Sequence, residues 1–237
     1  DYYRQLLRVI YRLLFLMVTE ERDLVYDPED KRDGVLNLKK IYWDFYSIAR
    51  LRRQSEKQYL YETQFSDIWQ GLINTFRLFE AEGNGIKLGI SPLDGDLFNY
   101  SAITDLQNCR ISNKLMLECI RNLNEFTDIN KNLVPINYRS LDVEELGSVY
   151  EGLLELHPVI ENLEATTSSQ ITFIFHEGTD RKTTGSYYTR PELVNELIKS
   201  ALIPVIEERL KERAGNKDEQ VKALLRLKVC DAAAGSG

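Results

Sequence analysis

The stretch Asp231-Ala-Ala-Ala-Gly-Ser-Gly237 follows an apolar run in which Leu225, Leu227 and Val229 recur at every second position. Apolar residues with this spacing predict a strand through residues 225–229. Small residues after a strand allow the backbone to make a tight turn whose amides can face a ligand. A strand that runs into a glycine-rich turn is how a Rossmann-type fold begins, although a glycine pair after a strand is by itself common turn chemistry.

A second motif, Gly185-Ser-Tyr-Tyr-Thr189, lies upstream of this turn. It runs into Thr189-Arg-Pro-Glu192, the pattern of a capping box, in which the threonine and glutamate side chains each accept a hydrogen bond from the other residue's amide. Gly185 and Ser186 leave the backbone free to turn closely, so residues 185–189 can form a shelf beside a ligand at a helix start. Because a well-capped helix needs no ligand, this motif alone leaves a structural interpretation open.

Taken as a pair, the two motifs resemble those of the adenine-specific DNA methyltransferases of bacterial restriction and phage-defence systems. The likeness is closest to the large type IIG restriction-modification enzymes and to the phage-growth-limitation type of defence methyltransferase, which place a helical region before the methyltransferase core. Further stretches share it, so that it covers most of the chain: Tyr11-Arg-Leu-Leu-Phe-Leu16, Asp94-Gly-Asp-Leu-Phe98 and Glu145-Leu-Gly-Ser-Val-Tyr-Glu-Gly-Leu-Leu-Glu155.

The resemblance implies methyl transfer from S-adenosylmethionine to the exocyclic amino group of adenine in double-stranded DNA. It also implies which residues bind the cofactor. Two features depart from the family: Arg190 precedes Pro191 where the family usually has proline directly after the threonine, and Ala232 and Ala234 replace a proline and a cysteine. The implied cofactor-binding residues are Tyr187, Tyr188 and Thr189 on one wall and Asp231, Ala233, Gly235 and Gly237 on the other.

The family's catalytic motif, Asn/Asp-Pro-Pro-Tyr/Phe, accepts hydrogen bonds from the adenine amino group and stacks on a base flipped out of the duplex. No such sequence occurs in residues 1–237. We therefore expect an N-terminal fragment that has no catalytic residues of its own and is inactive alone. In the full-length protein, the resemblance implies double-stranded DNA as a partner, and a nuclease domain or a defence-complex subunit as a further one.

The front of the chain predicts amphipathic helices over residues 4–18, 38–49 and 65–79, whose aromatic side chains we interpret as packing. The predicted fold is therefore mainly α, with a helical bundle-like region over residues 1–165. The first elements of an α/β Rossmann-type methyltransferase core follow over residues 166–237. An alternative function is a non-catalytic helical scaffold that docks a nuclease, a partner subunit or a DNA-recognition domain.

Several shorter signals complete the prediction. Gly83-Asn-Gly85 and Ser91–Gly95 indicate an irregular loop, and residues 115–123 a short helix. Asp142, with Glu145 three residues later, predicts a helix that ends near His157-Pro158. Residues 170–176 favour a strand, and Glu177–Asp180 a turn, which predicts a hairpin leading into the glycine-tyrosine motif. After Thr189, Pro204 is expected to bend or end the helix.

The formal net charge of −7 is local, because residues 141–180 hold nine acidic residues and no lysine or arginine. This segment is a poor candidate for the main DNA groove, and we interpret it as a solvated acidic helix face. No apolar stretch approaches the ~20 residues of a membrane helix, and no signal peptide pattern opens the chain. Three cysteines without metal-ligand spacing fit a reducing cytoplasm, and we expect free thiols that are mostly buried.

Three rival sites receive little support. Asp27, Glu29 and Lys31 superficially resemble a nuclease metal site, but they lie within five residues of one loop, whereas such carboxylates come from separate positions along strands. The two histidines, His157 and His176, are distant in sequence and lack nearby cysteines, which disfavours zinc. Arg50-Leu-Arg-Arg53 is able to contact phosphate, but a charge cluster at a helix end is the simpler interpretation.

Overall fold

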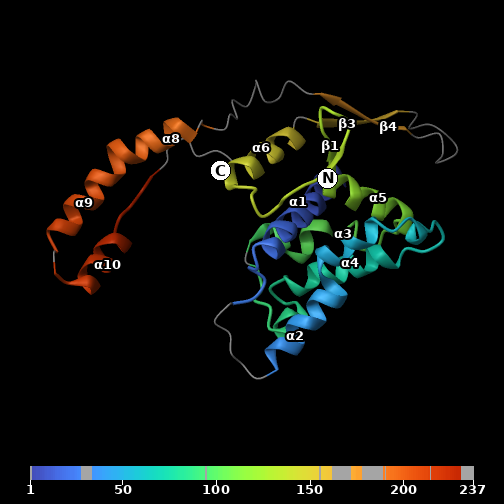
Figure 1. Cartoon of the computed structure of the whole chain (residues 1–237), viewed down its shortest axis with the longest axis horizontal. Coiled ribbons are helices and arrows are strands. Elements are labelled where there is room, and N and C mark those ends of the chain that lie inside the picture. The colour runs from blue at the N-terminus through green and yellow to red at the C-terminus, as the bar shows by residue number, and fades with distance from the viewer. Residues whose placement is uncertain are drawn as a thin grey trace. The chain divides into compact units, whose positions relative to one another are not determined.

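The computed structural model describes residues 2–27, 34–93, 95–154, 156–161, 172–177, 189, 191–213 and 215–230. The chain divides into two compact units, unit 1 (Asp1–Leu141) and unit 2 (Asp142–Gly237). The described residues are mainly helical, as the sequence predicts, with two short antiparallel strand pairs (Figure 1). The predicted functional boundary between residues 165 and 166 falls in the stretch 162–171, which lies outside the described residues.

Unit 1 is built from helices joined by irregular and 3₁₀ segments, followed by a hairpin in which Phe126 pairs with Val134. None of the described helices is long and apolar enough to cross a membrane. The main elements are α1 (Tyr2–Glu21), α2 (Val35–Ile41), the π-helix η1 (Tyr42–Tyr46), α3 (Ile48–Ser55), α4 (Asp67–Leu78), α5 (Asn113–Asn124), β1 (Glu125–Thr127) and β2 (Leu133–Pro135); the 3₁₀ turns are η2 (Gln58–Leu60), η3 (Asn84–Leu88), η4 (Asp96–Phe98) and η5 (Tyr100–Ile103).

The core of unit 1 lies where α1 contacts α3, α3 contacts α5 and α5 contacts α4 (Figure 1). The predicted apolar stripes supply this core, and most of the aromatic residues on them are packed as expected. The ring centroids of Tyr42 and Phe79 are 6.1 Å apart in an edge-to-face arrangement. The largest buried apolar side chains are Leu16, Met17, Tyr42, Ile48, Leu51, Trp69, Leu72, Phe76, Phe79, Ile90 and Ile103.

The predicted continuous helix over residues 38–49 is wrong, because the chain leaves the helical conformation at Ser47 (φ −65°, ψ 147°). The segment before Ser47 is the π-helix η1, and α3 begins anew at Ile48. The Ser47 hydroxyl caps α3 by accepting a hydrogen bond from the amide of Arg50 at 3.1 Å. Phe45, just before the break, is exposed, although the predicted helix over residues 38–49 would pack its aromatic side chains in the core.

The acceptor that stabilises this break is Glu20, a carboxylate that is only 3% exposed. Its Oε1 accepts hydrogen bonds from the hydroxyl of Tyr42 and the amide of Ile48, and its Oε2 accepts one from the amide of Ala49, each at 2.7 Å. The two amides belong to the first turn of α3, where backbone donors lack partners and an anion is favoured. Burial raises the pKa of Glu20, and these hydrogen bonds oppose that shift.

A second buried charge, Arg12, ties α1 to the irregular segment that contains η4 and η5. In the sequence, Arg4, Arg8 and Arg12 recur every four residues, which predicts a basic flank of the helix, but Arg12 is fully buried. Its Nε donates to the carbonyl of Leu97 at 2.7 Å and its Nη2 to that of Asn99 at 2.8 Å. Burial lowers the pKa of Arg12 to about 10. The guanidinium also lies over the rings of Phe76 and Phe98, with its Nη1 4.0 Å from Glu80.

The predicted irregular loop after α4 is confirmed, and two glycines explain its path. A Cβ added to Gly83 would lie 1.8 Å from the carbonyl oxygen of Arg77, and one added to Gly85 would lie 1.8 Å from that of Leu78. Only glycine therefore allows the chain to turn back this closely against the end of α4.

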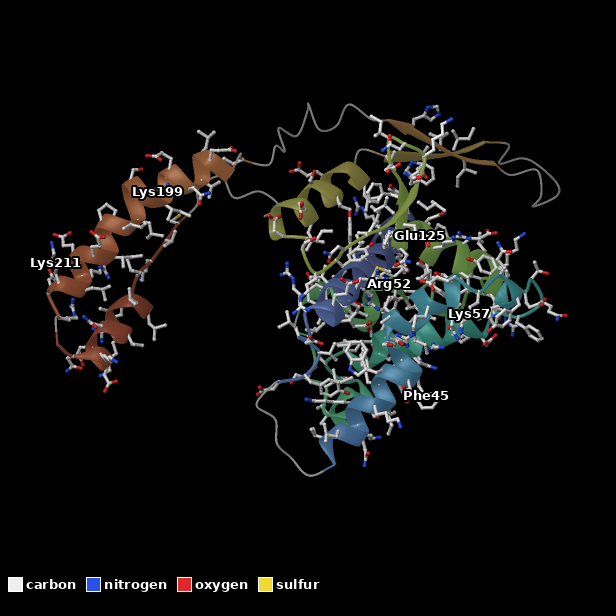
Figure 2. All side chains as sticks on the ribbon, viewed as in Figure 1. Phe45, Arg52, Lys57, Glu125, Lys199 and Lys211 are labelled. Carbon is white, nitrogen blue, oxygen red and sulfur yellow. The ribbon has the colours of Figure 1, made fainter. Side chains whose placement is uncertain are left out.

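Arg52 of α3, which Figure 2 labels, joins the end of α1 to the last segment of unit 1. Its guanidinium donates to the carboxylate of Glu21, to the side-chain oxygen of Asn124 and to the carbonyl of Ile136. It also lies over the ring of Tyr138, 5.3 Å from the centroid. Arg52 and Arg53 lie in the last turn of α3, as predicted, whereas Arg50 lies near its start. No local pattern in the sequence indicates the distant partners of Arg52.

Unit 2 opens with the helix α6 (Val143–Leu154), and its predicted capping box is confirmed. The amide of Glu145 donates to Oδ1 of Asp142 at 2.8 Å, and the amide of Asp142 donates to Oε2 of Glu145 at 2.9 Å. The helix α6 ends at Leu154. His157 and Pro158, near which its end was predicted, belong to the strand β3 (Leu156–Glu161).

The predicted strand at residues 170–176 is present as β4 (Thr172–Glu177). It pairs antiparallel with β3, which precedes it in the sequence. The prediction instead placed the turn of the hairpin after this strand, leading into the glycine-tyrosine motif. Pro158, which cannot donate a ladder hydrogen bond, stands opposite Phe175 in a two-stranded sheet, where both strands are edges. The turn predicted at residues 177–180 lies, beyond Glu177, outside the described residues.

Two helical segments complete unit 2: a run of α8 (Pro191–Leu197), the π-helix η7 (Ile198–Leu202) and α9 (Ile203–Lys211), and then α10 (Lys217–Leu225). The strand predicted through residues 225–229 is wrong, because Leu225 ends α10 and residues 226–230 are irregular. A strand needs a neighbour for its backbone hydrogen bonds, and the strand pairs of the described chain, β1–β2 and β3–β4, offer residues 226–230 none.

Replacing Glu20 with glutamine is expected to lower the free energy of unfolding by about 1–3 kcal/mol. A glutamine amide places an N–H group where the Ala49 amide needs an acceptor, so one buried donor loses its partner. Urea unfolding of the Glu20→Gln variant measures the loss. Glu82→Gln, at an exposed glutamate with no side-chain hydrogen bond among the described residues, is the control. Equal stability of the two variants would contradict the assigned role of Glu20.

The stability of the protein is expected to fall as the pH rises above 10.0, the ordinary pKa of tyrosine. Burial, and then the Glu20 carboxylate, raise the pKa of Tyr42 well above that value. The unfolded state then releases the proton first, so each pH unit above 10.0 costs at most about 1.4 kcal/mol from this group. Tyr42→Phe should show a shallower decline in urea unfolding between pH 9 and pH 11 than the wild type. Parallel declines would mean that Tyr42 does not titrate in this way.

Arg52→Lys should destabilise unit 1 by about 1–3 kcal/mol, because one ammonium group cannot replace a planar guanidinium that serves three acceptors. Amide hydrogen exchange should show loss of protection concentrated in residues 133–139, which Arg52 holds through Ile136. Arg53→Lys changes the neighbouring exposed arginine and should leave both the stability and the exchange pattern unchanged. A uniform loss of protection across unit 1 would argue against a local clamp.

Candidate functional site

The candidate cofactor-binding residues lie mostly outside the described residues. These are Tyr187, Tyr188, Asp231, Ala233, Gly235 and Gly237. Thr189 is described and is an exposed, non-helical residue shortly before α8. The structure therefore gives most of the segment that joins the two motifs (residues 189, 191–213 and 215–230), and not the walls of the site.

The helical run after Thr189 begins at Pro191, where the capping-box pattern predicts a helix start. Proline is favoured in the first turn because its missing N–H group would have no helical partner there. Pro204 does not end this run: α8 ends at Leu197, the π-helix η7 follows, and α9 begins at Ile203 with the proline in its first turn. A proline inside a helix removes one backbone hydrogen bond, and a π-helical turn is one way to accommodate such a loss.

The chain then reverses through Gly215, whose φ of +95° is a backbone conformation that favours glycine. Asn216 caps α10 by accepting hydrogen bonds from the amides of Asp218 at 3.1 Å and Glu219 at 3.3 Å. Ala223 is buried where α10 contacts α9. An open cavity of about 450 Å³ lies between these helices, with both acidic and basic side chains on its walls.

The apolar side of this helical segment remains uncovered. The side chains of Leu193, Leu197 and Val205 are exposed, and Leu225, at the end of α10, is 81% exposed. Burial of apolar surface is the main source of stability in proteins. An amphipathic helix whose apolar side is exposed to solvent is therefore suited to pack against another apolar surface. Among the described residues of unit 2, nothing covers this side.

The rival sites gain nothing from the structure. Asp27 is described and exposed, but Glu29 and Lys31 lie outside the described residues. His157 and His176 are Cα partners in the register of the β3–β4 pair. Within the described residues, no group of three or more histidine, cysteine or carboxylate side chains could hold a metal ion.

The cysteines are free, but the expectation that they are mostly buried is wrong. Cys119 and Cys230 are exposed and Cys109 is partly exposed. Cys119 lies on the solvent side of α5, whose buried residues Met116, Leu117 and Ile120 surround it in sequence. Composition alone does not show which side of a helix a thiol occupies.

The predicted position of Phe65, another residue of unit 1, is also wrong. The helical pattern assigned Phe65 to the buried stripe of the third helix, but α4 begins only at Asp67 and Phe65 is 54% exposed. The phenyl ring lies at an open cavity of about 520 Å³ that residues from two loops line. The sequence signal for this cavity is the presence of glutamine and asparagine in both loops. A prediction based on the helical spacing of apolar residues does not take these polar residues into account.

Comparison with known proteins adds no assignment: no protein-family model, no curated protein and no solved structure matches this chain.

Proposed function

We propose that this chain is the N-terminal part of an adenine-specific DNA methyltransferase of a restriction-modification or phage-defence system. In this proposal the full-length protein transfers the methyl group of S-adenosylmethionine to the exocyclic amino group of adenine in double-stranded DNA. The observation that carries it is the pair of motifs, Gly185–Thr189 and Asp231–Gly237, at the two ends of one helical segment.

The described geometry supports the proposal in two ways. A helix begins directly after the tyrosine-threonine motif, so the free amides of its first turn lie next to Tyr188 and Thr189 in sequence. Such a helix start favours a polar or anionic group, as the carboxylate of S-adenosylmethionine is. The uncovered apolar side of α8 and α9 is, in addition, what a helix of an α/β core presents to its sheet.

The proposed roles follow the chemistry of the residues. Tyr187, Tyr188 and Thr189 form one wall, where aromatic rings can stack on the cofactor and the threonine hydroxyl can bond to it. The glycine-rich turn of Asp231, Ala233, Gly235 and Gly237 forms the other wall, where small residues let backbone amides approach the ligand. The proposal assigns the catalytic step to residues outside this chain, since residues 1–237 contain no Asn/Asp-Pro-Pro-aromatic sequence.

One observation favours the alternative, a scaffold that docks a partner. The tip of the β1–β2 hairpin presents Ile129, which is 98% exposed. The turn beneath it is fixed by Asp128, whose carboxylate accepts hydrogen bonds from the amides of Asn130 and Asn132, both at 2.8 Å. A rigid turn that displays an apolar side chain is suited to insertion into a partner's pocket. Scaffolding and methyl transfer are compatible within one full-length protein.

The test uses the natural full-length protein and its Tyr188→Ala variant. Loss of a cofactor wall should weaken S-adenosylmethionine binding, measured by isothermal titration calorimetry, at least about tenfold, which corresponds to ~1.4 kcal/mol. Tyr59→Ala, at an exposed tyrosine of unit 1, is the matched control and should bind as the wild type does.

The same experiment includes a methylation assay on double-stranded DNA, read as N6-methyladenine by mass spectrometry. We expect methylation by the full-length protein and none by residues 1–237 alone. Methylation by the 237-residue chain would refute the assignment of the catalytic step to residues outside it. Unchanged cofactor binding in Tyr188→Ala would instead favour the scaffold.

A further inference from the structure

Unit 1 contains an open cavity of about 520 Å³ between the loop that enters α4 and the loop that precedes α5. It lies apart in sequence from both methyltransferase motifs. Its volume falls within the ~300–1,000 Å³ range of small-molecule sites. The side chains that give it its character are Gln64, Phe65, Asp67, Gln70, Asn108 and Arg110.

Asn113, the first residue of α5, holds the loop 62–67 in place. Its amide donates to the carbonyl of Phe65, and its Nδ2 donates to Oδ1 of Asp67, both at 2.8 Å. Its Oδ1 accepts a hydrogen bond from the amide of Ile68 at 3.2 Å. Because Asn113 is buried, these contacts preorganise the cavity wall, so a ligand would not have to order this loop.

The cavity offers hydrogen-bonding groups that the protein leaves unused. The side chains of Gln64, Gln70, Asn108 and Arg110 form no hydrogen bond or ion pair within the described part of the chain. Each amide offers two donors and one acceptor oxygen, and the guanidinium offers five donors. The wall also carries a half-exposed phenyl ring, that of Phe65. The ligand that fits is therefore flat, has donors and acceptors along its edges, and carries an anionic group.

We propose that this cavity binds a purine nucleotide. The base stacks on the ring of Phe65, and the amides of Gln70 and Asn108 pair with its edge, because a carboxamide can donate to and accept from adjacent atoms of a purine. Arg110 binds the phosphate through charge-assisted hydrogen bonds. Asp67 keeps one carboxylate oxygen without a partner among the described residues, which accepts a hydrogen bond from the ribose and directs the phosphate towards Arg110.

The same chemistry occurs in a free nucleotide and in one nucleotide of a single strand. Aromatic stacking with edge recognition is common to both. The inference does not depend on the proposed methyl transfer, because none of its residues belongs to the cofactor motifs. S-adenosylmethionine shares the adenosine, but it has a positively charged sulfonium where AMP has its phosphate, so Arg110 disfavours it at that position.

The experiment titrates the 237-residue protein with AMP, GMP, adenosine, S-adenosylmethionine and a single-stranded oligonucleotide of six adenines, monitored by isothermal titration calorimetry. Binding should weaken about fivefold or more in Phe65→Ala, the lower end for loss of one stacked base. Arg110→Ala should weaken AMP binding and leave adenosine binding unchanged. The matched controls are Tyr59→Ala and Arg4→Ala, an exposed aromatic residue and an exposed arginine that do not line the cavity.

Each outcome decides the proposal. AMP or GMP binding that depends on Phe65 supports a free nucleotide as ligand, and binding of the oligonucleotide alone with the same dependence supports a single strand. No binding, or binding that Phe65→Ala and Arg110→Ala leave unchanged, overturns the proposal. Unchanged thermal unfolding of both variants shows that a loss of binding is not a loss of folding. S-adenosylmethionine binding that survives Phe65→Ala reports the separate, proposed cofactor site.

Discussion

The carboxylate of Glu20 is the interaction on which the rest of unit 1 depends. One buried anion satisfies the hydroxyl of Tyr42 and the first free amides of α3, and so it allows the chain to stop one helix and start another inside the core. Without an acceptor at this position, the buried amide of Ile48 and the half-buried amide of Ala49 would both be unpaired, which proteins avoid. The break at Ser47 then directs α3, and with it Arg52, towards α5 and the last segment of the unit.

Periodicity and local chemistry in the sequence were sufficient to predict most helices. The apolar stripe of residues 4–18, the loop at Gly83 and Gly85 and the capping box of Asp142 and Glu145 all depend on residues that are close in sequence. The break at Ser47 depends on Glu20, and the burial of Arg12 depends on carbonyls of Leu97 and Asn99. No local pattern encodes such partners, so a stripe that reads as continuous can be two helices and a basic flank can be core.

Local sequence patterns also predicted the candidate site only in part. The two motifs and the resemblance they carry come from the sequence alone, and most of their residues lie outside the described part of the chain. Thr189 and the start of α8 agree with the expected local structure, whereas the alternation of Leu225, Leu227 and Val229 did not give a strand. Alternation reports that one side of a segment is apolar, and a strand forms only where a neighbouring strand can accept its hydrogen bonds.

The distant partners of α1 have a consequence for the order in which unit 1 can form. Gln5 bonds to Asp105, 100 positions later in the chain, and Arg8 and Arg22 bond to carbonyls at residues 102 and 139. Helical proteins usually fold fast because their contacts are local, and closing long loops is slow. Unit 1 is helical in content, but these hydrogen bonds of its first segment are non-local, so they can form only once the chain beyond residue 100 is available to fold back.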